Sequence, residues 1–276
     1  MPGPKKDLSQ LCLHSITTKP WSLEEALDKY CEKGIGGISV WQNAIEKQGA
    51  KKAGKLLESY PIEVVSYVRG GFFPATSRRK RQKAIDHNKQ LLEEASLIKA
   101  PLLVLVVGAD PGQSLNKSRK QIQEGIEAIL PMARSLGVKL GIEPLHPMYA
   151  HSRSAINTLQ QANDMAESIK DAFVGLVVDV YHLWWEENLK KEIARCGKNE
   201  NLFAYHISDW KAPLQDILND RGLMGEGCIP LKKIKRWIGK AGFKGYHEVE
   251  IFSNRFWAMD QDRFLKKIID HYIQYA

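Results

Sequence analysis

Short apolar segments alternate with longer segments of helical period along the whole chain. Apolar runs of about four to eight residues are typical of buried parallel strands, and the amphipathic segments between them are typical of the helices that cover such strands. The pattern predicts eight strands, at residues 10–15, 37–41, 63–68, 102–107, 139–144, 175–180, 203–208 and 246–252. It predicts one helix after each strand, at residues 22–33, 43–59, 78–99, 117–136, 155–168, 189–196, 231–241 and 255–275.

Local signals support several of these helix ends. Ser22 and Glu25 stand three residues apart at the start of the first predicted helix, which is the spacing of a capping box. Gly34, Gly137 and Gly242 each follow a predicted helix, where a left-handed C-cap favours glycine. Eight consecutive βα units in 276 residues, without a proline-rich linker, predict an α/β fold with one closed (β/α)8 TIM barrel, a single domain over residues 1–276. A doubly wound eight-stranded sheet is the alternative.

Composition and charge exclude several classes of protein. Hydrophobic residues make up 43% and charged residues 26% of the chain, as in ordinary globular proteins, and the most apolar stretch, residues 101–108, is too short to cross a membrane. Because no apolar signal segment follows residues 1–6, we expect a cytoplasmic protein. Without a C-x-x-C pair, the four cysteines are expected to be free thiols; they are Cys12, Cys31, Cys196 and Cys228.

The formal net charge of +8 raises the question of an anionic partner. The basic excess is diffuse, and its densest run, residues 78–83, has no interleaved aromatic residues on which bases could stack. This run is typical of a solvated helix face. A nucleic-acid partner is therefore not expected, and a homo-oligomer is left open.

Ionisable residues stand at the ends of the last four predicted strands. Glu143 ends the fifth strand, Asp179 the sixth and His206 the seventh, and the eighth carries Glu248 and Glu250. In a barrel of this type the C-terminal strand ends meet at one mouth. Carboxylates crowded there would repel one another without a cation, so the pattern predicts one divalent metal ion, with Mn²⁺ or Mg²⁺ favoured and Co²⁺ or Zn²⁺ as alternatives.

Position separates the two glutamates of the eighth strand. Side chains two residues apart in a strand share a face, so Glu248 and Glu250 point the same way. Glu250 is nearer the rim and is the better metal ligand, whereas Glu248 is expected to lie deeper and support the site. His182, just past the sixth strand, is expected to contact substrate, and His14 could either reach the pocket or remain a core histidine.

Several motifs resemble the sugar phosphate isomerase/epimerase superfamily, the xylose isomerase-like barrels of the AP endonuclease 2 type. The matching segments are TTKPW at 17–21, GIGGI at 34–38, GIEPL at 141–145, DVYHLWW at 179–185, HISDW at 206–210 and EVEIFS at 248–253. The resemblance implies Glu143, Asp179, His206 and Glu250 as metal ligands. It also implies that His182 contacts substrate hydroxyls together with Arg221, which begins the segment RGLMGEG.

Two departures separate this chain from the endonuclease IV-type branch of that superfamily. The third and fourth strand ends read VRGG and VGAD, and the seventh is followed by DWK, so the additional histidines of a three-metal site are missing. The resemblance therefore implies a sugar or keto-sugar isomerase or epimerase with one metal ion. A phosphodiesterase is the less favoured alternative.

Proton transfer next to a carbonyl needs acid/base groups beside a Lewis acid. Glu143 and Glu250 come from strands three apart and are predicted to be this acid/base pair as well as ligands. Aromatic residues near strand ends could pack on a sugar or polyol-derived substrate; they are Trp41, Phe72, Phe73, Trp184, Trp185, Trp210 and Trp257. A lyase or dehydratase using the same enediolate chemistry and a non-catalytic binding barrel remain alternatives.

Overall fold

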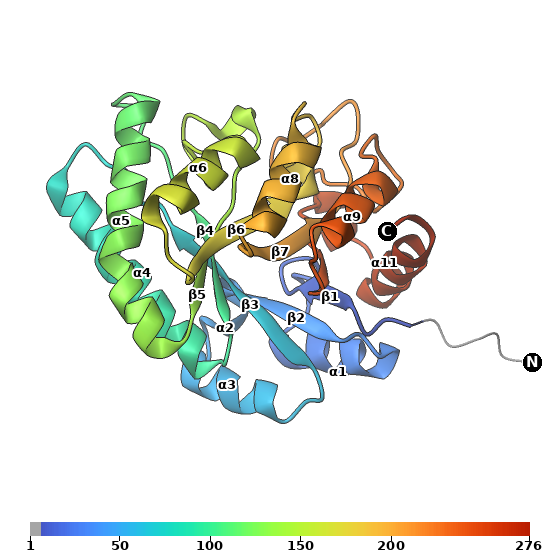
Figure 1. Ribbon diagram of the computed structural model, residues 1–276. Helices are drawn as coiled ribbons and strands as arrows, with labels where there is room; N and C mark the ends of the chain where they lie inside the picture. Colours follow the sequence, from blue (N-terminus) through green and yellow to red (C-terminus); the bar gives the residue numbers. More distant parts are fainter. Residues whose placement is uncertain (1–6) are drawn as a thin grey trace, which may run out of the picture.

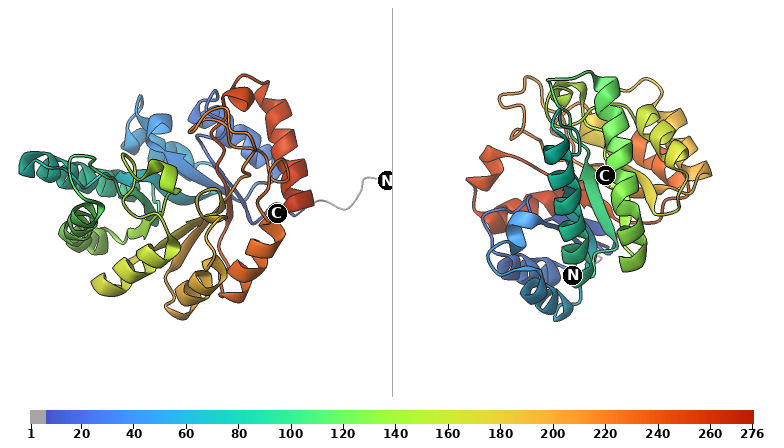
Figure 2. Two further views of the ribbon diagram at one scale, coloured as in Figure 1. Left: turned by 90° about the horizontal axis from the view of Figure 1, so that it is seen from above. Right: turned by 90° about the vertical axis from the view of Figure 1, so that its left-hand side faces the viewer.

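The structure is a computed structural model that describes residues 7–276. Residues 1–6, on which part of the prediction of a cytoplasmic protein rests, lie outside the described residues. Eight parallel strands close into one barrel in chain order, and helices form a layer around it (Figures 1 and 2). This confirms the predicted TIM barrel and excludes the doubly wound sheet. The strands are β1 Leu11–His14, β2 Gly37–Trp41, β3 Glu63–Gly71, β4 Leu102–Val106, β5 Lys139–Ile142, β6 Val174–Asp179, β7 Leu202–Ile207 and β8 His247–Val249.

Helices follow the strands as the apolar periodicity predicts, and the two longest, α4 and α5, lie side by side on one flank (Figure 1). None of the helices within residues 7–276 is long and apolar enough to cross a bilayer. The helices are α1 Leu23–Lys33, α2 Gln42–Ile45, α3 Ala50–Glu58, α4 Arg78–Leu97, α5 Leu115–Leu136, α6 Leu159–Ile169, α7 Val180–Leu183, α8 Leu189–Lys198, α9 Leu231–Lys240, α10 Asn254–Trp257 and α11 Gln261–Tyr275, with a 3₁₀ turn η1 at Pro147–Tyr149.

The predicted cap signals are present. Ser22 and Glu25 form the capping box of α1. Gly34, Gly137 and Gly242 all have positive φ, at 73°, 71° and 87°, which is the left-handed conformation that glycine adopts without steric cost. The four cysteines are free, as predicted.

Three predicted helices have different bounds in the structure. The helix expected at 43–59 is two helices, because the chain turns at Gly49 with φ 78°. The one expected at 155–168 begins only after Thr158, since Ala155 and Ile156 form backbone hydrogen bonds with the segments after β4 and β5. The one expected at 255–275 is broken before Asp260, whose side chain caps α11 by accepting from the amide of Arg263.

Two apolar clusters are buried in the barrel. The smaller one reaches the C-terminal strand ends, where Trp41 ends β2; its buried members are Ile16, Trp41, Val68, Leu102, Val104, Val177, Ala204 and Phe252. A larger apolar cluster lies outside the sheet, between the strands and the helices. Since β1 pairs with β8, the first and last strands lie side by side, and residues far apart in sequence meet at the mouth.

Candidate metal centre

The four predicted ligands lie together at the C-terminal mouth of the barrel. Glu143 follows β5, Asp179 ends β6, His206 is in β7 and Glu250 follows β8. One potential ligand atom from each lies within 4.8 Å of the others, and all four residues are buried. The structure therefore brings together the residues that the sequence places at four separate strand ends, while their coordination of a metal stays a prediction.

Arg221 reaches into this cluster. Its Nη1 lies 2.9 Å from Asp179 Oδ2 and 2.9 Å from Glu250 Oε2. A backbone hydrogen bond from Arg221 to the carbonyl of Phe252 fixes the loop that carries it, and the guanidinium lies over the ring of Tyr181 at 4.4 Å. The predicted substrate contact is thus also a partner of two predicted ligands. Each carboxylate oxygen has two lone pairs, so an oxygen that accepts from Arg221 can still face a cation.

His182 lies next to Arg221 rather than in the ligand set. It belongs to α7, is 3% exposed, and its Nε2 lies 3.1 Å from Arg221 Nη2. Burial lowers the pKa of this imidazole well below its usual value, and the charge of Arg221 lowers it further. A neutral His182 can both donate and accept a hydrogen bond, and its contact with substrate stays a prediction.

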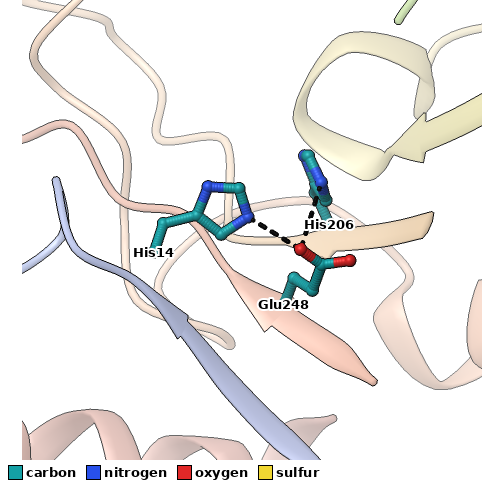
Figure 3. Close-up of side chains that lie close together, drawn as sticks. All are labelled: His14, His206 and Glu248. Carbon is teal, nitrogen blue, oxygen red and sulfur yellow. Dashed lines mark hydrogen bonds and ion pairs between the residues drawn. The ribbon is translucent and has the colours of Figure 1, made fainter. Parts of the chain in front are cut away.

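A second polar layer lies directly beneath the predicted ligands. In it, Glu248 Oε2 accepts a hydrogen bond from Ser39 Oγ at 2.6 Å and lies 3.1 Å from His14 Nε2 and 3.6 Å from His206 Nε2. Figure 3 shows the two imidazoles converging on this one carboxylate oxygen. The register of β7 and β8 pairs His206 with Glu248, so both side chains enter the barrel at the same level. Glu248 occupies the deeper position predicted for it.

His14 links the deep layer to the rim. Its Nδ1 lies 3.0 Å from Glu250 Oε1 and 3.0 Å from the indole Nε1 of Trp41. With Nε2 turned to Glu248, the ring spans the two glutamates of the last strand. His14 therefore holds Glu250 from below, which is the core position that the sequence left open.

Charge and burial act against each other in the site. Burial raises the pKa of Glu143, and it also raises that of Asp179. Burial opposes charge on His206, yet the carboxylates of Glu248 and Glu143 raise the pKa of this imidazole to about 10. For Glu250, burial favours the neutral form, but His14 and Arg221 hold its pKa well below the usual range.

The donor set fits a divalent cation. Three carboxylates and one imidazole are oxygen and nitrogen ligands suited to Mn²⁺, Mg²⁺, Co²⁺ or Zn²⁺. The Nδ1 atom of His206 lies 3.1 Å from Glu143, and its Nε2 atom points toward Glu248. Glu248 is therefore the carboxylate on the side of the ring that faces away from the other predicted ligands. Carboxylates behind a ligating histidine orient the ring and increase its basicity.

Aromatic residues form two walls beside the site. The Trp210 ring lies 4.8 Å from His146 and 4.9 Å from Tyr181, and Trp184 is 5.8 Å away. On the opposite wall Trp41 packs edge-on against Phe252 at 5.1 Å. The prediction for Phe73 is wrong, because this residue is buried against Gly125 of α5, where absence of a side chain leaves room for its ring.

Sequence reasoning missed Arg69 and Tyr149. Arg69 lies near the end of β3 and lines a cavity of about 740 Å³ together with Trp41 and Lys19. Tyr149 is in η1, and its ring lies 5.7 Å from that of His182. Arg69 could have been predicted, because it is a charged residue directly after the apolar strand predicted at 63–68. Nothing in the sequence indicates that Tyr149 lies near His182, since only the fold brings the two together.

The family model of the xylose isomerase-like TIM barrel matches residues 28–268. The chain belongs to this family. Within the xylose isomerase-like family, a chain described as inosose isomerase from Bacillus licheniformis is 22% identical over 198 residues, covering 71% of this chain and 69% of that protein.

Solved structures show the same fold. The crystal structure of protein SMc04130 from Sinorhizobium meliloti 1021 has a TM-score of 0.94 and 41% identity, with 98% of this chain and 99% of that chain covered. The structure described as IOLI protein with a binding zinc atom has a TM-score of 0.83 at 19% identity, with 96% and 97% covered.

Asp209 begins the DWK segment, in which this chain differs from the endonuclease IV-type branch. Its side chain accepts hydrogen bonds from the amides of Gly225 at 2.9 Å and Ile229 at 3.0 Å. Asp209 therefore orders the loop before α9, because both of its carboxylate oxygens accept hydrogen bonds from backbone amides.

Proposed function

We propose that this chain is a divalent-metal-dependent isomerase or epimerase acting on a sugar, a keto-sugar or a polyol-derived substrate. The observation that carries the proposal is the convergence of Glu143, Asp179, His206 and Glu250 at the barrel mouth. Membership of the xylose isomerase-like family and the similarity to proteins described as inosose isomerases support it.

Glu143, Asp179, His206 and Glu250 would hold the metal ion. When bound, a divalent cation supplies a Lewis acid for the oxygens of a carbonyl and its neighbouring hydroxyl. The chain itself orients the ligands from behind, since His14 contacts Glu250 and Glu248 stands under His206. We favour Mn²⁺ or Mg²⁺ because oxygen donors predominate.

Glu143 and Glu250 are proposed to move the proton. They approach from β5 and β8, which lie three strands apart around the ring, so that a sugar lying between them offers a different face to each carboxylate. His14 and Arg221 hold the pKa of Glu250 well below its usual range, which suits a base, and Glu143 is proposed to return the proton from the other side of the substrate.

The aromatic walls have a separate task. Trp41 and Phe252 on one wall and Trp210 on the other present flat apolar faces of the kind that pack on the C–H faces of sugars. Excluding water from the reacting carbon protects an enediolate from side reactions. His182 and Arg221 are placed to hold hydroxyl groups.

Solvent deuterium exchange into substrate tests the proposal, with metal content measured on the same sample. We expect one divalent ion per chain and exchange with at least one member of a panel of ketoses, keto-sugars and inososes. Glu250→Gln should reduce the exchange rate by about 10²- to 10⁴-fold, the usual contribution of a positioned base. The matched control is Glu63→Gln at the opposite end of the barrel, where Glu63 accepts from Tyr246.

Retained exchange in folded Glu250→Gln would remove this residue from the acid/base role. A protein without a bound ion after incubation with each of the four metals would contradict the metal dependence. NMR of the products separates the alternatives: an unsaturated product or two fragments would identify a lyase in place of an isomerase.

A further inference from the structure

Arg69 stands at the mouth of the barrel without a partner for its charge. It is half-buried near the end of β3, and none of the hydrogen bonds or ion pairs described for residues 7–276 involves its guanidinium. Its Cζ lies 5.6 Å from the ring centroid of Trp41 and 5.1 Å from that of Phe72. These rings orient the side chain but leave its five N–H donors available.

Trp41 ties Arg69 to the candidate metal centre. The indole N–H of Trp41 meets Nδ1 of His14 at 3.0 Å, and the same nitrogen lies 3.0 Å from Glu250. Arg69 is thus one aromatic ring away from a residue that touches a predicted ligand. Arg69 also lines the 740 Å³ cavity, whose other lining residues include Trp41 and the acids Glu46 and Glu94. Glu94 already accepts a hydrogen bond from the hydroxyl of Tyr67 at 2.6 Å.

Arg153 approaches the same region from the segment between β5 and α6. Its guanidinium also has no hydrogen-bond or ion-pair partner in the described part of the chain, and it lies over the ring of Tyr149 at 5.9 Å. Tyr149 in turn contacts His182, the neighbour of Arg221. Arg153, like Arg69, therefore lies over an aromatic ring and has no hydrogen-bond or ion-pair partner for its guanidinium among the described residues.

The backbone brings the two arginines onto neighbouring segments. Gly108, after β4, donates to the carbonyl of Arg153 at 2.8 Å. On its other side Gly108 packs so closely on Phe72 that a Cβ would meet the Phe72 Cα at 2.7 Å. The guanidinium of Arg69 lies over the ring of Phe72, so Gly108 contacts both of the segments that carry the arginines.

The two cations feel each other and the carboxylates of the site. Burial lowers the pKa of Arg69, the charge of Arg153 lowers it further, and Glu250 and Glu143 act in the opposite direction. Two like charges on neighbouring segments repel each other, and an anion bound between them would relieve that repulsion.

We propose that Arg69 and Arg153 form a binding site for an anionic group of the substrate, a carboxylate or a phosphate, at the end of the molecule away from its reacting carbon. This inference rests on the proposed function, and it narrows the substrate to an acidic derivative of a sugar. The planar arginine fork matches both anions through paired N–H···O hydrogen bonds. Binding energy from this remote group would fix the reacting carbon between Glu143 and Glu250.

Matched probes test the anion site, with the titrations run in the presence and in the absence of Mn²⁺. D-Fructose, its terminal phosphate ester and D-fructuronate share a ketose end and differ only at the far end of the chain. Calorimetric titration should show one of the two anionic probes binding roughly ten- to a hundredfold more tightly than fructose, as expected for charge-assisted hydrogen bonds. Which of them is preferred distinguishes a phosphate from a carboxylate.

Arg69→Gln and Arg153→Gln should each abolish most of this preference while leaving the affinities for fructose and Mn²⁺ unchanged. Arg69→Lys keeps the charge but not the fork, and should retain part of the preference. The control is Arg79→Gln, which changes an exposed arginine at the start of α4. Because neither guanidinium has a hydrogen-bond or ion-pair partner within residues 7–276, thermal melting should show all variants folded.

Equal affinities for the charged and neutral probes would overturn the inference, as would anion preference that survives both glutamine substitutions or falls equally in Arg79→Gln. Failure of the proposed function looks different. It would appear as anion preference that depends on Arg69 in a protein that binds no stoichiometric metal and exchanges no substrate proton.

Discussion

Two buried histidines on neighbouring strands face opposite sides of the barrel wall. His206 of β7 points inward, among Glu143 and Glu248, whereas His247 of β8 points outward to α11, with its Nδ1 2.8 Å from the hydroxyl of Tyr272. Burial opposes the charge of both rings. Carboxylates nevertheless raise the pKa of His206 to about 10, while burial, together with Lys235, lowers that of His247 to about 4.

The difference teaches that burial alone does not set the charge of a side chain in this fold. The interior of the barrel concentrates carboxylates and so favours positive charge, whether from imidazolium, guanidinium or a metal ion. In the layer between strands and helices, burial and the charge of Lys235 both act against a charged His247, and there the neutral ring is the stable form. The chemistry of the site therefore depends on which face of a strand a residue occupies.

We expect Glu248→Gln to have the largest effect, on both the metal affinity and the stability of the site inside the barrel. Removing this carboxylate from beneath His14 and His206 should weaken metal binding about 10- to 100-fold. It should also lower the free energy of unfolding by about 3–5 kcal/mol, because the buried imidazoles lose their anionic partner. Competition with a chelating dye and urea unfolding measure the two effects.

A buried carboxylate outside the barrel gives the matched control. Glu192 of α8 accepts from Asn163 and pairs with Arg195. Glu192→Gln should lower stability without changing metal affinity. Equal losses of metal affinity in the two variants would show that Glu248 acts only through general stability.

Acid should destabilise the protein through His247, the histidine that points out of the barrel. The imidazole of His247 titrates at about 4 in the folded protein and near 6.5 when unfolded. Between these pH values the unfolded chain binds more protons, so the free energy of unfolding falls as pH decreases, by on the order of 3 kcal/mol from this residue. His247→Gln should flatten the slope of unfolding free energy against pH between 6.5 and 4. An unchanged slope would contradict the assignment.

Tyr272→Phe should have the smallest effect. It removes the hydroxyl that meets His247 Nδ1 and should cost about 1 kcal/mol of unfolding free energy at neutral pH, the usual value of one buried hydrogen bond. Metal affinity should stay the same, since the change lies outside the barrel. A fall in metal affinity comparable with that of Glu248→Gln would show that the two faces of the wall are coupled.

The fold could be predicted largely from the sequence because its strands are apolar and its helices amphipathic throughout. The errors fall where local chemistry interrupts a helical period. Gly49 turns the chain between α2 and α3, and Asp260 starts a new helix, although apolar residues recur across both points. Ala155 was predicted as helical because its composition allows it, but its amide bonds to Gly108 from a distant strand end.

The candidate ligands could be predicted because each ends a strand and all parallel strands of a barrel end at one mouth. Contacts among loops could not. That Arg221 lies against Asp179 and Glu250 depends on how a long loop folds back onto the segment after β8. The same holds for Arg153, whose place beside Arg69 follows from backbone pairing with Gly108.

The pairing of β1 with β8 has a consequence for biosynthesis. His14 is made among the first residues of the barrel, and Glu248 and Glu250 among the last. A nascent chain that lacks the final strand contains Asp179 and His206 without these glutamates, and its barrel cannot close because β1 has no β8 to pair with. The four predicted ligands are therefore present together only after translation has passed residue 250.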